Sequence, residues 1–356
     1  MACTTCHRFT TWRRRPPRSR LVMDRAAAAL VLAAALAAAA PARALTLAEI
    51  EGDLGLSSQE RARLERGQVL SRTVPNSNER ELAVALAVKI DLPPAELAKQ
   101  LLGGLAQRQN PDVLGRGVIS TGALSEFSGV KLANAAAAQA YLSAKPGGAL
   151  NLSAAEIAAF QELARQPGTS ADPRKAVEGL IRQQLQARYQ SYTAKGLAGI
   201  APYARASGEA RPAEDLLAAT RASKFFAKYT PKMLQLLTDY PKGRPSDFDE
   251  RQQWALYNAN GARAIVLQQL FALPDGDAWS VAARQYYVST SYNAEQNLML
   301  FVPADEGGTV AVMLSRVSTE QVAGLGGSMK RSIGAKMMAD TLSGIAARVR
   351  QATGKK

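Results

Sequence analysis

The sequence predicts an α+β protein that combines an antiparallel sheet, a long C-terminal helix and a helical insertion. Three observations lead to this prediction. Apolar residues alternate with period two over 79–90, as they do in a strand with one buried face. Residues 133–250 show helical spacing instead. Four strand-like segments between 262 and 317 are then joined by short turns, and a long helical pattern covers 328–350.

Residues 1–44 have the composition of an export signal. Six Arg lie between positions 13 and 25, and the uncharged, Ala-rich run 26–42 follows them. The run ends in Ala42-Arg43-Ala44, a small-x-small pattern typical of a cleavage site. A retained anchor is the alternative, but a membrane span needs about 20 strongly apolar residues. We therefore predict a signal peptide over 1–44 and an exported protein, periplasmic or secreted, after cleavage near Ala44.

The remaining 312 residues contain neither Cys nor His. Cys3, Cys6 and His7 form a C-x-x-C-H haem-attachment pattern, but cleavage would remove it. The lack of both residue types excludes Ser-His-Asp and Cys-His nucleophiles, zinc sites built on His or Cys, His-ligated haem, iron–sulfur clusters and disulfides. We expect no catalytic residue, no metal and no cofactor, while Asp, Glu, Tyr and Lys chemistry stays open as an alternative.

The positive charge is concentrated at the C-terminal end. Of the formal net charge of +14, residues 1–44 carry +7 and residues 328–356 carry +6, which leaves +1 for 45–327. The basic segment indicates either contact with an anionic membrane surface or a solvated helix with a polar tail. Basic and aromatic residues are not interleaved, so we predict no nucleic-acid partner.

Residues 45–132 are predicted to form the N-terminal part of the α+β domain. A capping box, Ser57-x-x-Glu60, starts one helix, and Pro93-Pro94 opens another. The predicted elements are helices at 46–53, 57–66 and 94–102, strands at 68–74 and 79–90, and one or two strands within 113–130.

Residues 133–250, called the helical block below, are predicted to be a helical insertion or subdomain. A second capping box, Ser153-x-x-Glu156, starts its first clear helix, and longer helical patterns cover 174–194 and 212–239. Residues 251–356 are predicted to form an antiparallel meander and the C-terminal helix. Its predicted strands are 262–273, which also fits a helix, 277–292, 295–303 and 309–317, followed by a helix from the N-cap Ser328 to about residue 350.

This order of elements resembles the START-like, or SRPBCC, helix-grip superfamily. The resemblance is carried by residues 79–102 (ERELAVALAVKIDLPPAELAKQLL) and 309–350, and it covers about half of the chain after residue 44. It implies a curved antiparallel sheet gripping a long C-terminal helix, with an apolar cavity between them. The helical insertion is longer than this fold usually carries. The chain also resembles uncharacterised exported bacterial proteins, which implies no activity.

The segment 284–292 is the densest mixture of aromatic and polar residues. On a regular strand, Arg284, Tyr286 and Tyr292 share one face and Tyr287 lies on the other. One face is a candidate lining for an amphipathic ligand, with tyrosine hydroxyls as orienting groups. Ordinary cross-strand packing of the same residues is the alternative. Trp254 and Arg316 complete the set of candidate ligand-binding residues.

A second candidate site lies where the last helix begins. Gly326, Gly327 and Ser328 form a Gly-rich turn at a helix N-terminus, and Lys330 and Arg331 follow it. Free backbone N–H groups and two cations favour an anion. A flexible turn into a capped helix is the alternative interpretation.

These observations lead to three hypotheses about function. The first is a non-catalytic exported protein that binds a hydrophobic or amphipathic small molecule, such as a lipid. The second is an envelope structural or interaction protein that uses the helical block as a docking surface. The third is an enzyme that uses Asp, Glu, Tyr or Lys, for which two carboxylates would have to converge in a pocket.

Overall fold

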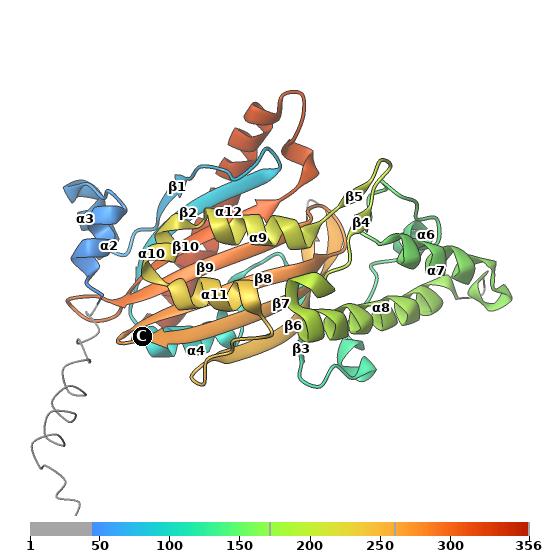
Figure 1. Ribbon diagram of the computed structural model, residues 1–356, viewed down its shortest axis with the longest axis horizontal. Helices are drawn as coiled ribbons and strands as arrows, with labels where there is room; N and C mark the ends of the chain where they lie inside the picture. The colour runs from blue at the N-terminus through green and yellow to red at the C-terminus, as the bar shows by residue number, and fades with distance from the viewer. Residues whose placement is uncertain (1–44, 171, 260, 355–356) are drawn as a thin grey trace, which may run out of the picture. The chain divides into compact units, whose positions relative to one another are not determined.

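The computed structural model describes residues 45–354 apart from Ala171 and Asn260. The predicted signal peptide therefore lies outside the described residues. None of the helices in the described part of the chain is long and apolar enough to cross a membrane. The α+β class predicted from the sequence is confirmed, because one large antiparallel sheet is combined with a long C-terminal helix and several others (Figure 1).

The sheet has eight strands in the order β1-β2-β10-β9-β8-β7-β6-β3, and every neighbouring pair is antiparallel. Successive strands β6 to β10 form an antiparallel meander, of which β7 to β10 were predicted, while β2 pairs with β10 from the far end of the chain, with Ile90 opposite Thr309. The strands are β1 (Leu70–Thr73), β2 (Glu81–Ile90), β3 (Val113–Ile119), β6 (Asp249–Ala259), β7 (Ala262–Asp275), β8 (Ala278–Val288), β9 (Ala294–Pro303) and β10 (Thr309–Ser318).

The turn before β10 depends on a glycine. Gly308 has φ +83°, and a Cβ at this position would lie 2.6 Å from the carbonyl oxygen of Ile90. A side chain would thus be strained and would also clash with the backbone of the neighbouring strand. The glycine at this turn therefore allows β10 to start close against the end of β2.

Helices cover both faces of the sheet. In Figure 1, α9 (Pro212–Ala222), α10 (Lys224–Tyr229) and α11 (Pro231–Asp239) cross in front of the strands, and α12 (Gly327–Thr353) lies behind them. Alternate residues of one strand belong to different cores: Leu298 and Leu300 pack with the helical block, and Phe301 packs on the side of α4 (Pro94–Leu102) and α12.

The prediction of one buried face for residues 79–90 is therefore wrong. Val88 and Ile90 are buried on the α4 side, and Ala83 and Ala87 on the opposite face are buried as well. The larger apolar residues of this strand lie on one face and the alanines on the other, and both faces are covered.

The remaining helices and a small hairpin lie around the sheet and the helices that cover it (Figure 1). Both predicted capping boxes are present, at Ser57–Glu60 and Ser153–Glu156. In the described part of the chain, the other helices are α2 (Leu47–Asp53), α3 (Ser58–Glu65), α5 (Leu105–Gln109), α6 (Ala135–Leu142), α7 (Ala154–Arg165) and α8 (Pro173–Lys195). The same residues form the short 3₁₀ turns η1 (Leu124–Phe127), η2 (Pro167–Ser170), η3 (Gly196–Gly199) and η4 (Glu320–Val322), and a small hairpin of β4 (Tyr203–Ala204) and β5 (Glu209–Ala210).

Two local features differ from the expectations, and two agree with them. Residues 262–273 form a strand, as predicted, and not the alternative helix, and residues 113–130 contain one strand, within the predicted one or two, followed by the turn η1. Residues 249–259 form strand β6, which was not predicted. Helix α12 begins at Gly327, and its N-cap is Gly326 with φ +73°, so the predicted N-cap Ser328 is wrong.

Candidate functional site

A cavity of about 180 Å³ lies between the sheet and the helices α4, α5 and α12. Six strands and three helices contribute to its wall, and most of the wall is apolar. The lining residues are Leu86, Val88, Ile90, Leu97, Leu101, Ala106, Gln107, Asn110, Tyr257, Gln268, Leu270, Ala283, Gln285, Glu295, Asn297, Met299, Phe301, Ala311, Met313, Leu342, Ile345, Ala346 and Val349.

The cavity exists because small side chains line it where larger ones would fill it. Ala283 and Ala311 come from the sheet, and Ala346 comes from α12. Helix α12 contacts β2, β1 and α5, so it lies toward one side of the sheet. Helix α4 packs on β7, β8 and β9 and supports the other side. The two helices thus pack on different parts of the sheet. The cavity lies between them, over strands whose side chains are short at this place.

One end of the cavity is polar, and it is formed by Gln268, Gln285, Glu295 and Asn297. Glu295 is the centre of this polar end. Its Oε2 accepts a hydrogen bond of 2.6 Å from Nε2 of Gln285, and its Oε1 accepts one of 2.8 Å from Nδ2 of Asn297. Burial raises the pKa of Glu295 above its ordinary value, because the charged form loses its hydration and no cation replaces it.

A second set of hydrogen-bonded polar side chains, centred on Gln268, lies beside Gln285. Oε1 of Gln268 accepts hydrogen bonds from Nε2 of Gln107 at 3.1 Å and from Nε2 of Gln253 at 2.6 Å. Oε1 of Gln107 and Oδ1 of Asn297 are buried and have no hydrogen-bond partner. Unpaired buried acceptors cost free energy, so both are places where a donor would be stabilising.

The titratable side chains among the described residues that line the cavity are those of Glu295 and Tyr257. Glu295 is the sole carboxyl group among the described residues that line the cavity. The convergence of two carboxylates that an acid–base enzyme would need is therefore not found there. No group of three or more Asp, Glu, His and Cys in the described part of the chain is placed to hold a metal ion.

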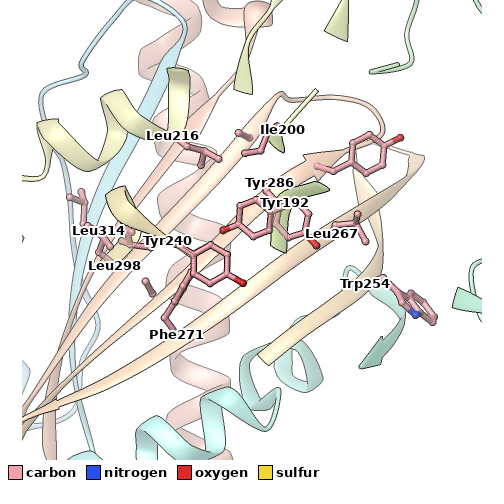
Figure 2. Close-up of a cluster of buried hydrophobic side chains, with 14 of the residues drawn as sticks. Tyr192, Ile200, Leu216, Tyr240, Trp254, Leu267, Phe271, Tyr286, Leu298 and Leu314 are labelled. Carbon is pink, nitrogen blue, oxygen red and sulfur yellow. The ribbon is translucent and has the colours of Figure 1, made fainter. Parts of the chain in front are cut away.

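Three of the predicted ligand-binding residues do not line the cavity, because they face the helical block. The side chain of Arg284 is fully buried, and its Nη2 donates to Oε1 of Gln296 at 3.0 Å. The ring of Tyr286 stacks on Tyr192 of α8 with 3.9 Å between ring centroids (Figure 2). The guanidinium of Arg188, also on α8, lies 4.2 Å from the ring centroid of Tyr287.

The predicted alternation of Tyr286 and Tyr287 is wrong because strand β8 contains a bulge. The pairing with β7 shifts between Leu267 opposite Tyr287 and Gln268 opposite Gln285, so Tyr286 is an extra residue. A bulge interrupts the period of two, and both tyrosines then contact α8. Gln285 points to the cavity and Arg284 to the opposite face.

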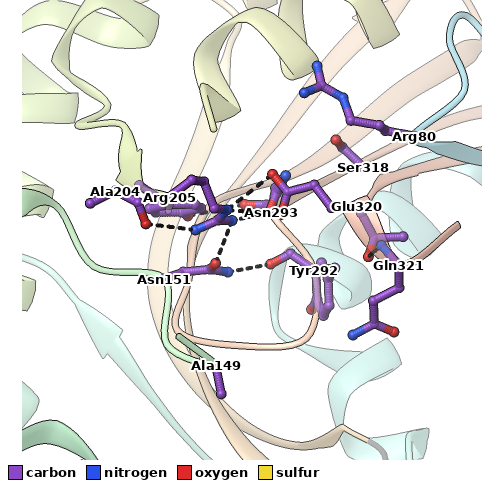
Figure 3. A network of polar contacts seen from close by, with 12 residues as sticks. Arg80, Ala149, Asn151, Ala204, Arg205, Tyr292, Asn293, Ser318, Glu320 and Gln321 are labelled. Carbon is purple, nitrogen blue, oxygen red and sulfur yellow. Dashed lines mark hydrogen bonds and ion pairs between the residues drawn. The ribbon is translucent and has the colours of Figure 1, made fainter. Parts of the chain in front are cut away.

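Tyr292 is the predicted residue that lies nearest to the polar end. Its hydroxyl donates to Oε1 of Gln285 at 2.6 Å, and Nε2 of that glutamine holds Glu295. The turn that carries Tyr292 is anchored by Asn151, whose Nδ2 donates to the carbonyl oxygen of Tyr292 at 2.7 Å. Arg205 donates to Asn151 and Asn293 and forms an ion pair with Glu320 (Figure 3).

Trp254 and Arg316 have structural contacts away from the cavity. Nε1 of Trp254 donates to the carbonyl oxygen of Glu126 at 2.8 Å, and its ring occupies the space beside Gly117 and Gly129. Nη1 of Arg316 donates to Glu81 at 2.6 Å in a buried ion pair between β10 and β2.

The predicted anion site is only partly assembled. Gly326 and Gly327 do form the start of α12, but Nη1 of Arg331 donates to the carbonyl oxygens of Glu79 and Val322. Its guanidinium is thus used to fasten the helix to the chain before β2. Ser328 and Lys330 are exposed beside this turn.

The residues of the polar end were not identified from the sequence. A usable signal was present in β9, where Glu295 and Asn297 share a face with Met299 and Phe301. Two polar residues at one end of an otherwise apolar strand face indicate a buried polar group. The apolar residues Leu342, Ile345 and Val349 of α12 lie within the helix predicted over 328–350, but their contact with a cavity depends on the tertiary arrangement.

Comparisons with known proteins found no relative. No family model matches the chain, and neither a curated protein nor a solved structure matches it. The function therefore has to be inferred from the cavity and the surface of this chain.

Proposed function

We propose that the protein binds a small apolar or amphipathic molecule in the cavity between α12, α4, α5 and the sheet, without catalysing a reaction. The observation that carries this proposal is a largely apolar wall that ends in a few polar groups. This combination is typical of ligand pockets, in which apolar area supplies affinity and polar groups orient the ligand. The order of elements also supports a proposed relationship to the START-like superfamily.

The size of the cavity limits the guest. Its volume of about 180 Å³ is close to the roughly 150 Å³ of an engineered cavity that holds benzene. It is smaller than the roughly 300–1,000 Å³ of pockets for drug-sized ligands. We therefore expect a guest of about six to ten heavy atoms, or one end of a longer chain, and not an entire lipid.

The docking hypothesis for the helical block has less support. The exposed large apolar side chains of the described residues are Leu114, Val118, Leu124, Leu325, Met329, Ile333 and Met337, and none of them belongs to that block. Its apolar residues, such as Ile181 and Leu185 of α8, are buried in the core that it shares with the sheet.

The proposal is tested by filling the cavity. Calorimetric titration of the purified protein with 1-octanol should show binding, and Ala346→Trp should abolish it, because the indole occupies the space. Met337→Trp is the matched control, since Met337 lies on the same helix and its side chain is exposed. The proposal would be contradicted if 1-octanol did not bind the unmodified protein, or if it bound Ala346→Trp and the control equally well.

A second proposed interaction is contact between α12 and an anionic membrane surface. Leu325, Met329, Ile333 and Met337 are 100%, 70%, 55% and 60% exposed, and they recur at intervals of four residues. Lys330 and Lys336 are exposed beside them. An apolar stripe flanked by cations is typical of helices that lie in the interface of anionic bilayers.

Sedimentation with vesicles tests this contact. We expect binding to phosphatidylglycerol vesicles that exceeds binding to phosphatidylcholine vesicles. Ile333→Gln should weaken binding to both, and Lys330→Gln with Lys336→Gln should remove the preference for the anionic lipid, at about 1 kcal/mol per cation. Leu124→Gln changes an exposed apolar residue elsewhere and should have no effect. Equal sedimentation with both vesicle types would exclude the electrostatic part.

A further inference from the structure

Glu295 lies in an unusual environment for a carboxyl group. It is the second residue of β9, where Gln285 of β8 and Val317 of β10 are its strand neighbours. Its hydrogen-bond partners are neutral groups, namely the amides of Gln285 and Asn297 and, at 3.5 Å, the hydroxyl of Ser315. The two nearby tyrosines, Tyr257 and Tyr292, add no positive charge.

The described lining of the cavity contains no Lys and no Arg. A carboxylate head group entering this space would leave water, meet Glu295 and find no counter-ion. Transfer of an unpaired charge out of water is strongly unfavourable, and a like charge nearby adds to the cost. The polar end of the cavity therefore disfavours fatty acids and other anions.

The same end offers several acceptors. The carboxyl oxygens of Glu295 can accept further hydrogen bonds, and the buried oxygens Gln107 Oε1 and Asn297 Oδ1 have no partner. Both side chains are more than nine-tenths buried. Buried acceptors without donors are satisfied by a ligand that brings its own O–H or N–H groups.

We propose that the cavity selects small apolar molecules whose head group donates hydrogen bonds, a hydroxyl or a protonated amine, and that Glu295 is the residue that recognises this head. The inference rests on the proposed binding function and specifies the chemistry of the ligand. The apolar wall formed by Leu101, Met299 and Ile345 would hold the hydrocarbon part.

Matched probes with one hydrocarbon skeleton test this selection. Calorimetric titrations at pH 7 with 1-octanol, octylamine and sodium octanoate vary only the head group. We expect the alcohol, the amine or both to bind at least tenfold more tightly than octanoate. If all three bind equally well, the selection is overturned while the proposed function stands. If none binds, the proposed function itself fails.

The substitution Glu295→Gln tests the role assigned to the carboxyl group. It keeps the shape of the side chain and removes the ionisable carboxyl group, so octanoate should bind at least fivefold more tightly than to the unmodified protein. If the preferred head group is an ammonium, Glu295→Gln should weaken the binding of octylamine at least tenfold. If the preferred head group is a hydroxyl, the binding of 1-octanol alone should weaken, by about threefold.

Glu306→Gln is the control for this substitution, because Glu306 lies in the exposed turn after β9 and its side chain is 86% exposed. Unchanged discrimination in Glu295→Gln would overturn the assignment. The head-group series needs no variant, so it decides the selection even if Glu295→Gln fails to fold.

Discussion

Arg316 was a candidate ligand-binding residue in the sequence, but in the structure it forms a buried ion pair with Glu81. Their side chains are 6% and 4% exposed, and they join β10 to β2 across 2.6 Å. The guanidinium also donates to the carbonyl oxygens of Pro75 and Ala222. Arg316 was predicted to bind a ligand, and it connects the neighbouring strands β10 and β2 with the end of α9.

Removing one partner of this pair should be costly. Glu81→Gln leaves the guanidinium buried without its counter-ion, so we expect a loss of about 3–5 kcal/mol in the free energy of unfolding, measured by urea denaturation. The exposed pair Arg165–Glu162 is the comparison, and Glu162→Gln should change stability by less than about 1 kcal/mol. Similar losses in the two variants would show that burial does not determine the contribution of the ion pair.

Glu295 should make stability depend on pH in a direction opposite to that of most carboxylates. Burial raises its pKa above the ordinary value of 4.5, so the folded protein holds the proton more tightly than the unfolded chain does. The stabilising contribution is complete below about pH 4.5 and is lost as the pH rises through the raised pKa.

Thermal unfolding between pH 4 and pH 8 measures this effect. Relative to Glu295→Gln, the unmodified protein should become progressively less stable as the pH rises. Glu306→Gln serves as the exposed control and should follow the unmodified protein. Parallel curves for the unmodified protein and Glu295→Gln would show that the carboxyl group is not held in a desolvated environment.

At the scale of elements, helix α12 explains a feature that was visible in the sequence. Its apolar stripe moves sideways between Met337 and Met338. The first part, including Met329 and Ile333, is exposed, and the second part, including Leu342, packs toward the sheet. One helix thus presents two faces to two environments.

Two glycines of α12 provide a test of its packing. A Cβ at Gly334 would lie 3.0 Å from Cδ1 of Leu82, whereas the nearest atom to a Cβ at Gly344 is Nη1 of Arg348 at 3.6 Å. Gly344→Ala should therefore gain about 1 kcal/mol from helix propensity. Gly334→Ala should gain less or lose stability, because Leu82 must move. Equal gains in chemical denaturation would contradict close packing of α12 on β2.

The elements that were predicted well are those whose local pattern agrees with their final surroundings. The capping boxes, the helix after Pro93 and the strands of the meander fall in this group. Strand β6 was not predicted because polar residues such as Gln252 and Gln253 interrupt its apolar pattern. Both faces of the strand are covered, so these residues are buried together with Trp254. The bulge at Tyr286 has no local signal, because it arises from the register with β7.

For the molecule as a whole, the sheet separates two different interiors. On the side of the helical block, ring contacts connect Tyr286 to Tyr192, Tyr192 to Tyr240 and Tyr240 to Phe271 (Figure 2). The other side keeps a cavity under α4 and α12. The sequence could indicate that a helix and a sheet meet, but the volume left between them depends on pairings across the whole chain, such as β2 with β10.

The most direct test of the binding proposal is a crystal structure of the protein soaked in 1-octanol. The proposal predicts electron density for one guest inside the cavity, with its hydrocarbon beside Met299 and Ile345 and its hydroxyl within hydrogen-bonding distance of Glu295 or Asn297. An empty cavity, or side chains that close the space between α12 and the sheet, would contradict it.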